Sequence, residues 1–192
     1  MPTLDRSSLL PEKATRIYET ERLYVRGLCL ADIDGPYFHW LNDRDVCRYN
    51  SHGLFPASRP ALESFVRSLT DRTDSVVWAV MRKDNSSHIG NLSLQAIDWV
   101  ARSAEFAILM GDKASWGKGY ATEAATLLFT HGFSRLNLNR IYCGTAAGNT
   151  AMRRLAEKLK MCHEGTRRQA MFLDGEYADV LEYGLLHDEF LA

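Results

Sequence analysis

The sequence predicts a single α/β domain in which helices flank a mixed, mostly antiparallel sheet. The chain has 192 residues, a length that fits one domain with a substantial core. Hydrophobic residues make up 46% of it and charged residues 24%, as in ordinary globular proteins. Strand-like and helix-like segments follow in the order β-α-α-β-β-β-α-β-α-β-β. Because hairpins are interspersed with crossovers in this order, a mixed sheet is expected and a doubly wound one is not.

The N-terminal part should contain one strand and two helices. Residues 1–14 are expected to be a tail or lead-in, which places the domain at 15–192. Residues 21–27 alternate apolar and polar side chains and predict the first strand. Residues 30–41 predict a helix. A capping serine and an early proline at 58–60 then mark the start of a second helix.

The middle of the chain predicts a hairpin and a further strand. Residues 76–81 and 89–97 are apolar strand-like runs, joined through the turn-rich tetrad at 83–86. Residues 104–110 form the next apolar run. This run leads directly into a glycine-containing loop at 116–119.

The C-terminal part predicts two helices and three strands. The helix after the glycine loop should place small residues on one face, and residues 140–145 predict the following strand. Asn149 is suited to cap a helix that ends near Leu159. The Asp174-Gly175 pair between two strand-like runs predicts a final hairpin.

The stretch Trp116-Gly117-Lys118-Gly119-Tyr120-Ala121-Thr122-Glu123-Ala124 stands where a strand gives way to a helix. The first N–H groups of a helix have no main-chain partner, and the aligned peptide dipoles place partial positive charge there. Two glycines without Cβ atoms let the loop bring its amides against a ligand. The pattern therefore predicts a site for an anion such as pyrophosphate, although an ordinary tight turn is the simpler alternative.

The spacing narrows the choice of ligand. The third residue after Gly119 is Thr122, so the Rossmann fingerprint is incomplete, and the Walker pattern is absent. The loop resembles the acetyl-CoA loop of the GCN5-related N-acetyltransferase (GNAT) superfamily, Q/R-x-x-G-x-G/A. Gly119 and Ala121 fill the last two positions, and Trp116 replaces the usual Gln or Arg. The sequence at 116–124 is similar to that found in the branch of the superfamily that contains ribosomal-protein-alanine, spermidine and amino-sugar acetyltransferases.

A second resemblance lies in the helix after Asn149. In the superfamily this Asn lies along the pantetheine arm, and the helix ends in Leu-Gly-Phe. Here Asn149 and Leu159 match, but Lys160-Met161 replaces Gly-Phe. Ala156 stands where many members carry a proton-donating tyrosine. Asn149 could also be only a helix cap, and the two roles are compatible.

The resemblance implies acetyl-CoA as co-substrate and direct acetyl transfer to a primary amine of a small molecule in a ternary complex. The residues implied in cofactor binding are the loop and helix start, two strand residues and two residues of the later helix: Trp116, Gly117, Lys118, Gly119, Tyr120, Ala121, Thr122, Ile108, Met110, Asn149 and Arg154. Arg153, Arg154 and Lys118 are candidates to pair with phosphates. An exposed basic helix face is the alternative for at least one of the two arginines.

The attacking amine must lose a proton, because a free alkylammonium is mostly charged at neutral pH. Glu105 is the candidate base, since it precedes the loop where family members often place a carboxylate. The alternative is that Glu105 is a solvated strand residue paired with a neighbour such as Arg102. No acid stands out; Tyr142, Thr150 and Ser93 are possible substitutes.

The acceptor pocket is expected to involve Trp40, Asn42 and Tyr49. The phrase Trp40-Leu41-Asn42-Asp43 is similar to one found in amino-sugar acetyltransferases of the same branch. A core position is the simpler interpretation of Trp40.

Composition limits which partners and metal sites are expected. A net charge of −1 gives no electrostatic reason to expect nucleic acid or an anionic membrane. Four scattered cysteines without a C-x-x-C pair indicate reduced thiols of a cytoplasmic protein, mostly in the core, and no metal site is expected. The oligomeric state stays open, with a homodimer as one option. Two functions compete with small-amine acetylation: acetylation of a protein N-terminus, and CoA sensing without turnover.

Overall fold

The computed structural model describes residues 15–191. The predicted lead-in at residues 1–14 lies outside the described residues.

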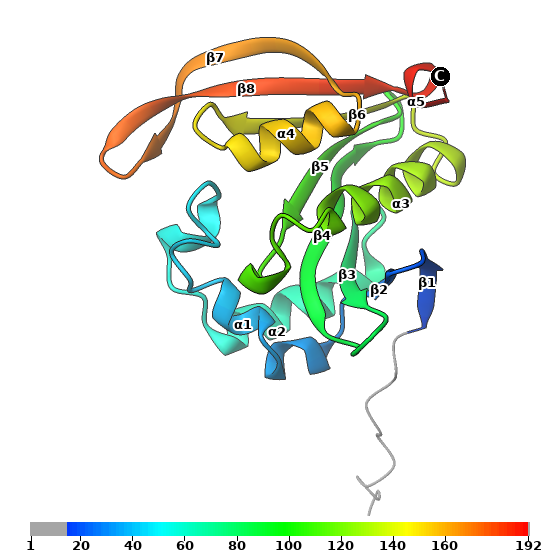
Figure 1. Ribbon diagram of the computed structural model, residues 1–192, viewed down its shortest axis with the longest axis vertical. Helices are drawn as coiled ribbons and strands as arrows, with labels where there is room; N and C mark the ends of the chain where they lie inside the picture. The colour runs from blue at the N-terminus through cyan, green and yellow to red at the C-terminus, as the bar shows by residue number, and fades with distance from the viewer. Residues whose placement is uncertain (1–14, 192) are drawn as a thin grey trace, which may run out of the picture.

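Within residues 15–191, the core element is one twisted sheet of eight strands (Figure 1). Every neighbouring pair is antiparallel except β5 with β6, which is parallel. The predicted mixed, mostly antiparallel sheet is therefore confirmed. In spatial order its strands are β1 (Arg16–Glu19), β2 (Leu23–Gly27), β3 (Val76–Arg82), β4 (His88–Asp98), β5 (Ser103–Leu109), β6 (Arg140–Ala146), β8 (Glu176–Leu186) and β7 (Cys162–Leu173).

Helices pack on both faces of this sheet and create two apolar clusters. The larger cluster lies under α3 and α4, and α3 contributes Ala124, Ala125, Leu128 and Phe129, all fully buried. The smaller cluster lies between the opposite face and the helices α1 and α2. The helices are α1 (Tyr37–Trp40), α2 (Arg59–Ser68), α3 (Tyr120–Ser134), α4 (Thr150–Lys158) and α5 (His187–Leu191).

Most predicted element boundaries are confirmed to within a residue or two. Ser58 caps α2 by accepting from the Ala61 N–H, and Asn149 caps α4 by accepting from the Met152 N–H. Gly175 adopts a φ of 90° in the turn between β7 and β8. This left-handed conformation suits glycine, which explains the Asp-Gly turn signal.

Near the N-terminus, one prediction is wrong and one strand was not predicted. The helix expected over 30–41 is instead a 3₁₀ helix at Leu30–Asp34 followed by the single-turn α1. Pro36 separates them, because a proline pushes the residue before it out of the helical region, and Gly35 is extended. The short strand β1 was not expected, and it pairs with β2 at the sheet edge.

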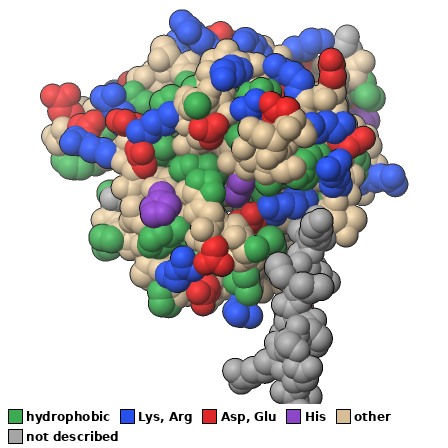
Figure 2. All heavy atoms as spheres, turned by 60° about the horizontal axis from the view of Figure 1, so that its bottom comes forward, with side chains coloured by type: hydrophobic (Ala, Val, Ile, Leu, Met, Phe, Trp, Pro, Cys, Tyr) green, Lys and Arg blue, Asp and Glu red, His purple; other side chains and the backbone are tan. Residues whose placement is uncertain are grey.

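The surface carries both signs of charge. On the face drawn in Figure 2, acidic and basic side chains are interspersed, which is unlike the one-sign surface that attracts a polyanion. Among the described residues, none of the helices has the length and apolar character needed to cross a membrane.

Candidate functional site

The strands β5 and β6 run side by side briefly and then part. Their parallel pairing begins with Ser103 opposite Arg140 and ends with Glu105 opposite Tyr142. β5 continues to Leu109, and over that stretch its described strand neighbour is β4 alone. Figure 1 shows the two strands diverging. The main chain of β5 beyond Glu105 is therefore available on one side, where an extended ligand bearing amides can pair with it as a strand would.

The loop between β5 and α3 ends in two glycines with left-handed backbone. Gly117 has a φ of 74° and Gly119 a φ of 82°; this conformation costs other L-residues about 1–2 kcal/mol. Gly119 is the N-cap of α3 and supplies no side-chain cap. Within the described chain, the amides of residues 117–122 donate no hydrogen bond. Free amides at the positive end of a helix dipole are able to bind an anion, which is the role that the sequence predicts for this loop.

Trp116 braces this loop. Its indole Nε1 donates to the carbonyl oxygen of Met110 at 2.8 Å, which ties the loop to the end of β5. Asp112 supports the preceding turn by accepting from the Ala114 N–H. The rest of the Trp116 side chain is 45% exposed. The residue that departs from the family pattern thus performs an evident structural task.

A charged clamp holds the other side of the loop. The Arg22 Nε donates to the Glu123 carboxylate at 2.8 Å, and Arg22 Nη1 donates to the Lys118 carbonyl at 3.1 Å. The guanidinium also lies over the Tyr120 ring, 4.7 Å from its centroid. Thr20 donates a further hydrogen bond to Glu123. Sequence reasoning missed Arg22, because its partners lie about a hundred residues away along the chain.

The start of α4 lies close to the segment after α1. Besides capping the helix, Asn149 follows Gly148, whose carbonyl accepts a hydrogen bond from the Tyr49 hydroxyl at 3.2 Å. Asn149 is half-buried and Tyr49 partly exposed. The structure therefore brings together one predicted cofactor residue and one predicted acceptor residue.

The two arginines of α4 differ in environment. Arg153 turns inward and donates to the Ala147 carbonyl at 3.3 Å, whereas Arg154 is exposed. Lys118 is exposed in the glycine loop. Ala156 is fully buried in the larger apolar cluster, so a tyrosine at that position would have to displace core side chains.

Glu105 occupies the last paired position before the strands part. Its carboxylate accepts a hydrogen bond from Gln95 Nε2 at 3.3 Å, and Tyr142 lies opposite on β6. The alternative pairing with Arg102 is not observed, because that guanidinium donates to the carbonyl and side-chain oxygens of Asn137 at 2.7 and 3.0 Å. Glu105 is half-buried and lies at the point where β5 and β6 part.

A cavity of about 540 Å³ lies between α2 and the sheet. Its sheet side includes Ala107, Ile108 and Leu109, the stretch of β5 beyond the divergence. Most lining side chains are apolar. Asn91, Ser93, Gln95 and Ser75 add polar atoms. The volume suits a small molecule.

Sequence reasoning missed this lining, although a signal was present. Residues 91–95 read Asn-Leu-Ser-Leu-Gln, an alternation that places the polar members on one face of β4. The two leucines are buried in the opposite, larger cluster. A polar stripe on an otherwise apolar sheet face is a signature of a binding surface.

The three predicted acceptor residues are not gathered around this cavity. Trp40 is 6% exposed, and its ring packs 4.9 Å from that of His88 and fills the space over Gly111. This gives Trp40 a packing role, as the simpler interpretation held. Asn42 borders a second cavity of about 450 Å³ and bonds to the main chain of Phe38 and Ala57. Tyr49 lies apart, beside α4.

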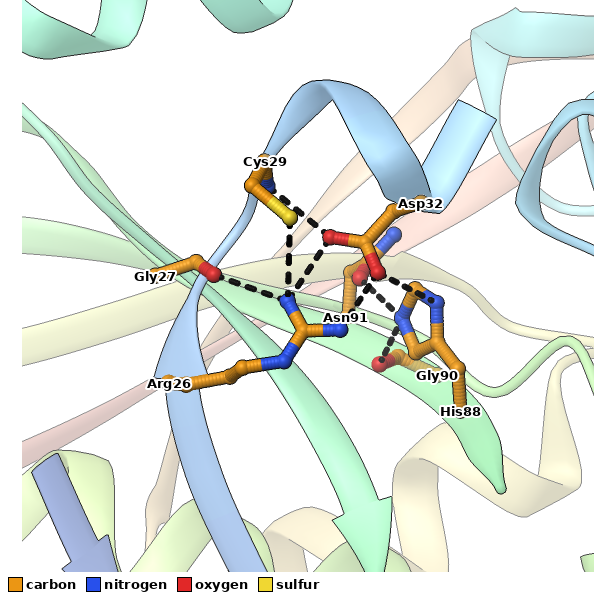
Figure 3. A network of polar contacts seen from close by, with 7 residues as sticks. All are labelled: Arg26, Gly27, Cys29, Asp32, His88, Gly90 and Asn91. Carbon is orange, nitrogen blue, oxygen red and sulfur yellow. Dashed lines mark hydrogen bonds and ion pairs between the residues drawn. The ribbon is translucent and has the colours of Figure 1, made fainter. Parts of the chain in front are cut away.

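A buried polar network supports the cavity floor (Figure 3). Arg26 donates to the Asp32 carboxylate at 2.8 Å, and Asp32 also accepts from the Cys29 N–H at 2.9 Å. His88 Nε2 lies 2.8 Å from Asn91 Oδ1 and 3.1 Å from the Gly90 carbonyl. Both partners are acceptors, so the ring carries its proton on Nε2 and fixes the Asn91 amide.

Burial shifts the titration of this network. Burial lowers the pKa of His88, and the nearby Asp32 charge opposes the shift only in part. Burial by itself would raise the pKa of Asp32, but hydrogen bonds from Arg26 and Cys29 outweigh it, so the pKa lies below its ordinary value. Burial and the Asp32 charge raise the pKa of Tyr37 to about 12. The ion pair is therefore charged, and His88 neutral, at neutral pH.

The cysteines divide between core and surface. Cys47 and Cys143 are buried, while Cys29 is half-buried and Cys162 exposed, so the expectation of mostly core positions holds for two of them. Burial raises the pKa of Cys143 to about 12, with help from the charges of Glu182 and Glu105. Over residues 15–191, no cluster of three His, Cys, Asp or Glu side chains is arranged to hold a metal ion.

Comparison with known proteins gives consistent results. Residues 22–162 match the model of the acetyltransferase (GNAT) domain. The chain is 30% identical over 173 residues to the N-acetyltransferase p20 of Bacillus licheniformis, covering 89% of this chain and 96% of that one. It is 32% identical over 171 residues to a spermidine N(1)-acetyltransferase of Vibrio cholerae, covering 88% and 96%.

The solved structures agree. The crystal structure of spermidine N-acetyltransferase from Vibrio cholerae, in complex with CoA and spermine, superposes with a TM-score of 0.82 at 25% identity. The match covers 90% of this chain and all of that one.

Proposed function

Because the chain belongs to the GNAT acetyltransferase family and is an acetyl-CoA-dependent N-acetyltransferase, we propose that it acetylates the primary amine of a small molecule. One observation carries this proposal. The stretch of β5 beyond Glu105 offers free main chain on the side where β6 departs, and the same stretch lines the 540 Å³ cavity. A thioester bound along β5 and an amine held in the cavity would therefore meet.

The loop residues fit the cofactor by an independent criterion. Gly119 has a backbone that other residues adopt only at a cost, and the amides of 117–122 have no partner within the described chain. In the proposed arrangement these amides, including those of Tyr120, Ala121 and Thr122, hold the pyrophosphate. Lys118 and the exposed Arg154 supply positive charge for phosphates.

The remaining cofactor residues have complementary tasks. The main chain of Ile108 and Met110 and the side chain of Asn149 would border the pantetheine arm. The Met110 carbonyl already accepts from Trp116, so Trp116 positions the loop. When bound, acetyl-CoA supplies an acetyl group activated as a thioester.

The proposed reaction is a direct transfer. The neutral amine nitrogen forms a bond to the acetyl carbonyl carbon, the carbon–sulfur bond breaks, and its electron pair leaves with sulfur. The nitrogen loses one proton and the thiolate gains one. Glu105 would accept the amine proton, directly or through a water, from its place at the strand divergence.

No single residue stands out as the acid. Ser93 lines the cavity and Tyr142 lies opposite Glu105, so both remain candidates, whereas Thr150 is exposed at the start of α4. The high pKa of Cys143 argues against that thiol as a nucleophile and supports transfer without an acyl-enzyme.

The acceptor, the assembly and the location are further parts of the proposal. We take 15–192 as one catalytic domain of a cytoplasmic protein. Self-association has support from the described edge strand β7, whose residues are mostly exposed, and from a dodecameric structure of the Vibrio cholerae spermidine N-acetyltransferase.

The decisive experiment follows thiol release from acetyl-CoA with a library of small primary amines and with peptides that have free N-termini. Turnover of small amines above the peptides, with the acetylated amine identified by mass, would support the proposal. Preferential turnover of peptides would favour the N-terminal acetyltransferase instead. Binding of CoA without thiol release for any amine would favour a sensor.

A further inference from the structure

The main cavity offers an apolar environment with no carboxylate among its described lining residues. Leu62 and Phe65 of α2 face Val77 and Ala107 of the sheet across it. The acidic residues carried by the same elements, Glu63, Asp98 and Glu105, are not part of this lining.

The positive side chain at the cavity is already neutralised. Arg72 donates to both oxygens of Asp74, at 2.7 and 2.9 Å, and this pair is largely exposed. The polar side chains that remain for a ligand are amides, hydroxyls and the imidazole of His52, whose pKa is lowered by burial. Two of them have buried polar atoms without a described partner, Ser75 Oγ and Asn91 Nδ2. A ligand here meets neutral polar groups on an apolar surface.

The second cavity does contain carboxylates, but each is engaged by a cation. Asp174 pairs with Arg44 at 2.9 Å and with Arg48 at 3.4 Å, and Asp43 pairs with Lys113 at 2.9 Å. The hydrogen bond from Arg44 lowers the pKa of Asp174, in keeping with a carboxylate that is already matched.

This charge arrangement is unfavourable for a polyamine. Each ammonium group that leaves water for an apolar cavity loses hydration, and it recovers the loss only when a carboxylate or several hydrogen bonds compensate it. Glu105 can serve one amine, because Gln95 links its carboxylate to the cavity lining at 3.3 Å. A second or third ammonium group on the same molecule would lie among apolar side chains.

We propose that the acceptor is a monoamine with an apolar, uncharged body, and that polyamines are poor acceptors. The inference rests on the proposed acetylation of a small amine and specifies its substrate class. The amino group lies toward Glu105 and Gln95, and the body fills the space between α2 and β3–β5. A volume of about 540 Å³ accommodates an aromatic ring on a short alkyl chain.

The test compares 2-phenylethylamine, hexylamine and spermidine as acceptors of the full-length chain at saturating acetyl-CoA, following thiol release. We expect kcat/KM for the two apolar monoamines to exceed that for spermidine by about tenfold or more. A kcat/KM for spermidine equal to or above theirs overturns the inference.

Failure of the proposed function gives a different result. If CoA binds but none of the amines or peptides releases thiol, acetylation of a small amine is refuted. Calorimetric titration of the CoA complex then still tests the cavity. Tighter binding of 2-phenylethylamine than of spermidine supports the inferred ligand class, and the reverse order overturns it.

A charge-introducing variant sharpens the test. Ala61 lies at the exposed first turn of α2 and lines the cavity. Ala61→Asp adds a carboxylate where the helix dipole favours one, so folding should be preserved. We expect kcat/KM for spermidine to rise about fivefold and that for 2-phenylethylamine to fall. The matched control, Ala101→Asp in the exposed β4–β5 turn, should change neither. If the ratio of kcat/KM for spermidine to kcat/KM for 2-phenylethylamine is the same in both variants, the inference is contradicted.

Discussion

The two halves of the site are built by different means. On the proposed cofactor side, the glycine loop and the first turn of α3 present main-chain amides, and the essential features fall within residues 116–124. On the proposed acceptor side, side chains from α1, α2, β3, β4 and β5 enclose the cavity. The first half depends on backbone conformation and the second on the volume and polarity of side chains. A local sequence motif can specify the former, whereas the latter exists only once distant elements have packed.

The charged supports of the two halves differ as well. The Arg22–Glu123 pair beside the loop has side chains that are 46% and 18% exposed. The Arg26–Asp32 pair behind the cavity has side chains that are 13% and 5% exposed. Solvent screens the first pair much more than the second. We therefore expect substitutions on the loop side to act mainly on CoA binding, and those in the buried network to act on stability.

The largest expected effect is that of Gly119→Val on CoA binding. A β-branched residue at a φ of 82° is strained, and relief of that strain would turn the free amides away. Strain and lost hydrogen bonds together amount to about 4 kcal/mol, or about a thousandfold in Kd. Calorimetric titration measures it.

Gly175→Val is the matched control, because Gly175 has a similar φ of 90° but lies in the β7–β8 turn. It should lower stability and leave the Kd for CoA unchanged. Unchanged CoA affinity in Gly119→Val would show that the loop is not the cofactor site.

Glu105→Gln tests whether Glu105, which lies between the two halves of the site, acts as the base. Loss of the base should lower kcat/KM by about a hundredfold while CoA binding is kept. The loss should be greatest at pH values below the pKa of the amine, where more of the acceptor is protonated. The control is Glu63→Gln on α2, a half-buried carboxylate outside the cavity lining. A pH–rate profile equal to that of the wild type would return Glu105 to a structural role.

A smaller effect is expected for Arg22→Ala. The clamp with Glu123 and the Lys118 carbonyl orders the loop, but partial exposure limits its strength to about 1 kcal/mol. The Kd for CoA should rise about fivefold. Arg59→Ala removes another exposed Arg–Asp pair, with Asp34, far from the loop in the fold, and should leave the Kd unchanged. Equal Kd values for CoA in the Arg22→Ala and Arg59→Ala variants would show that Arg22 does not contribute to cofactor binding.

Much of the fold, including the glycine loop before α3, could be predicted from local sequence. Serine and asparagine caps, an Asp-Gly turn and alternating strands each act over a few residues, so their patterns located α2, α4 and the hairpins. The error at 30–41 has a local cause too, because Pro36 keeps Gly35 out of the helical conformation and so divides the segment.

The acceptor side did not follow in the same way. Trp40 was predicted from a phrase that resembles sugar acetyltransferases, yet packing buries it against His88 and Gly111. The polar alternation at 91–95 was present in the sequence, but the helix that covers that face cannot be identified from it. The register of β4 against β5 and the position of α2 decide which side chains line the cavity.

The smallest expected effect concerns the pH dependence of stability in the buried network. Because burial depresses the pKa of His88, the unfolded chain binds a proton at that residue before the folded protein does. The free energy of unfolding should therefore decline as pH falls below about 6.5, the ordinary value for histidine, and should go on declining until the folded pKa is reached. Asp32, also depressed, contributes stability that is lost only at lower pH, as pH falls through its folded pKa.

Urea unfolding at several pH values between neutral and mildly acidic measures this decline, and His88→Gln should reduce its slope. His52 and His131, whose pKa values are also lowered by burial, should leave a residual slope. The groups that face His88 are Asp32, Arg26 and Asn91, and Tyr37 stays protonated throughout, so His88 is the member of the network that titrates in this range. His39→Gln, at an exposed site, is the matched control and should leave the slope unchanged. The free energy of unfolding could depend on pH with the same slope in His88→Gln and in His39→Gln. In that case the buried network around Arg26 and Asp32 would not differ in this respect from the exposed Arg22–Glu123 pair.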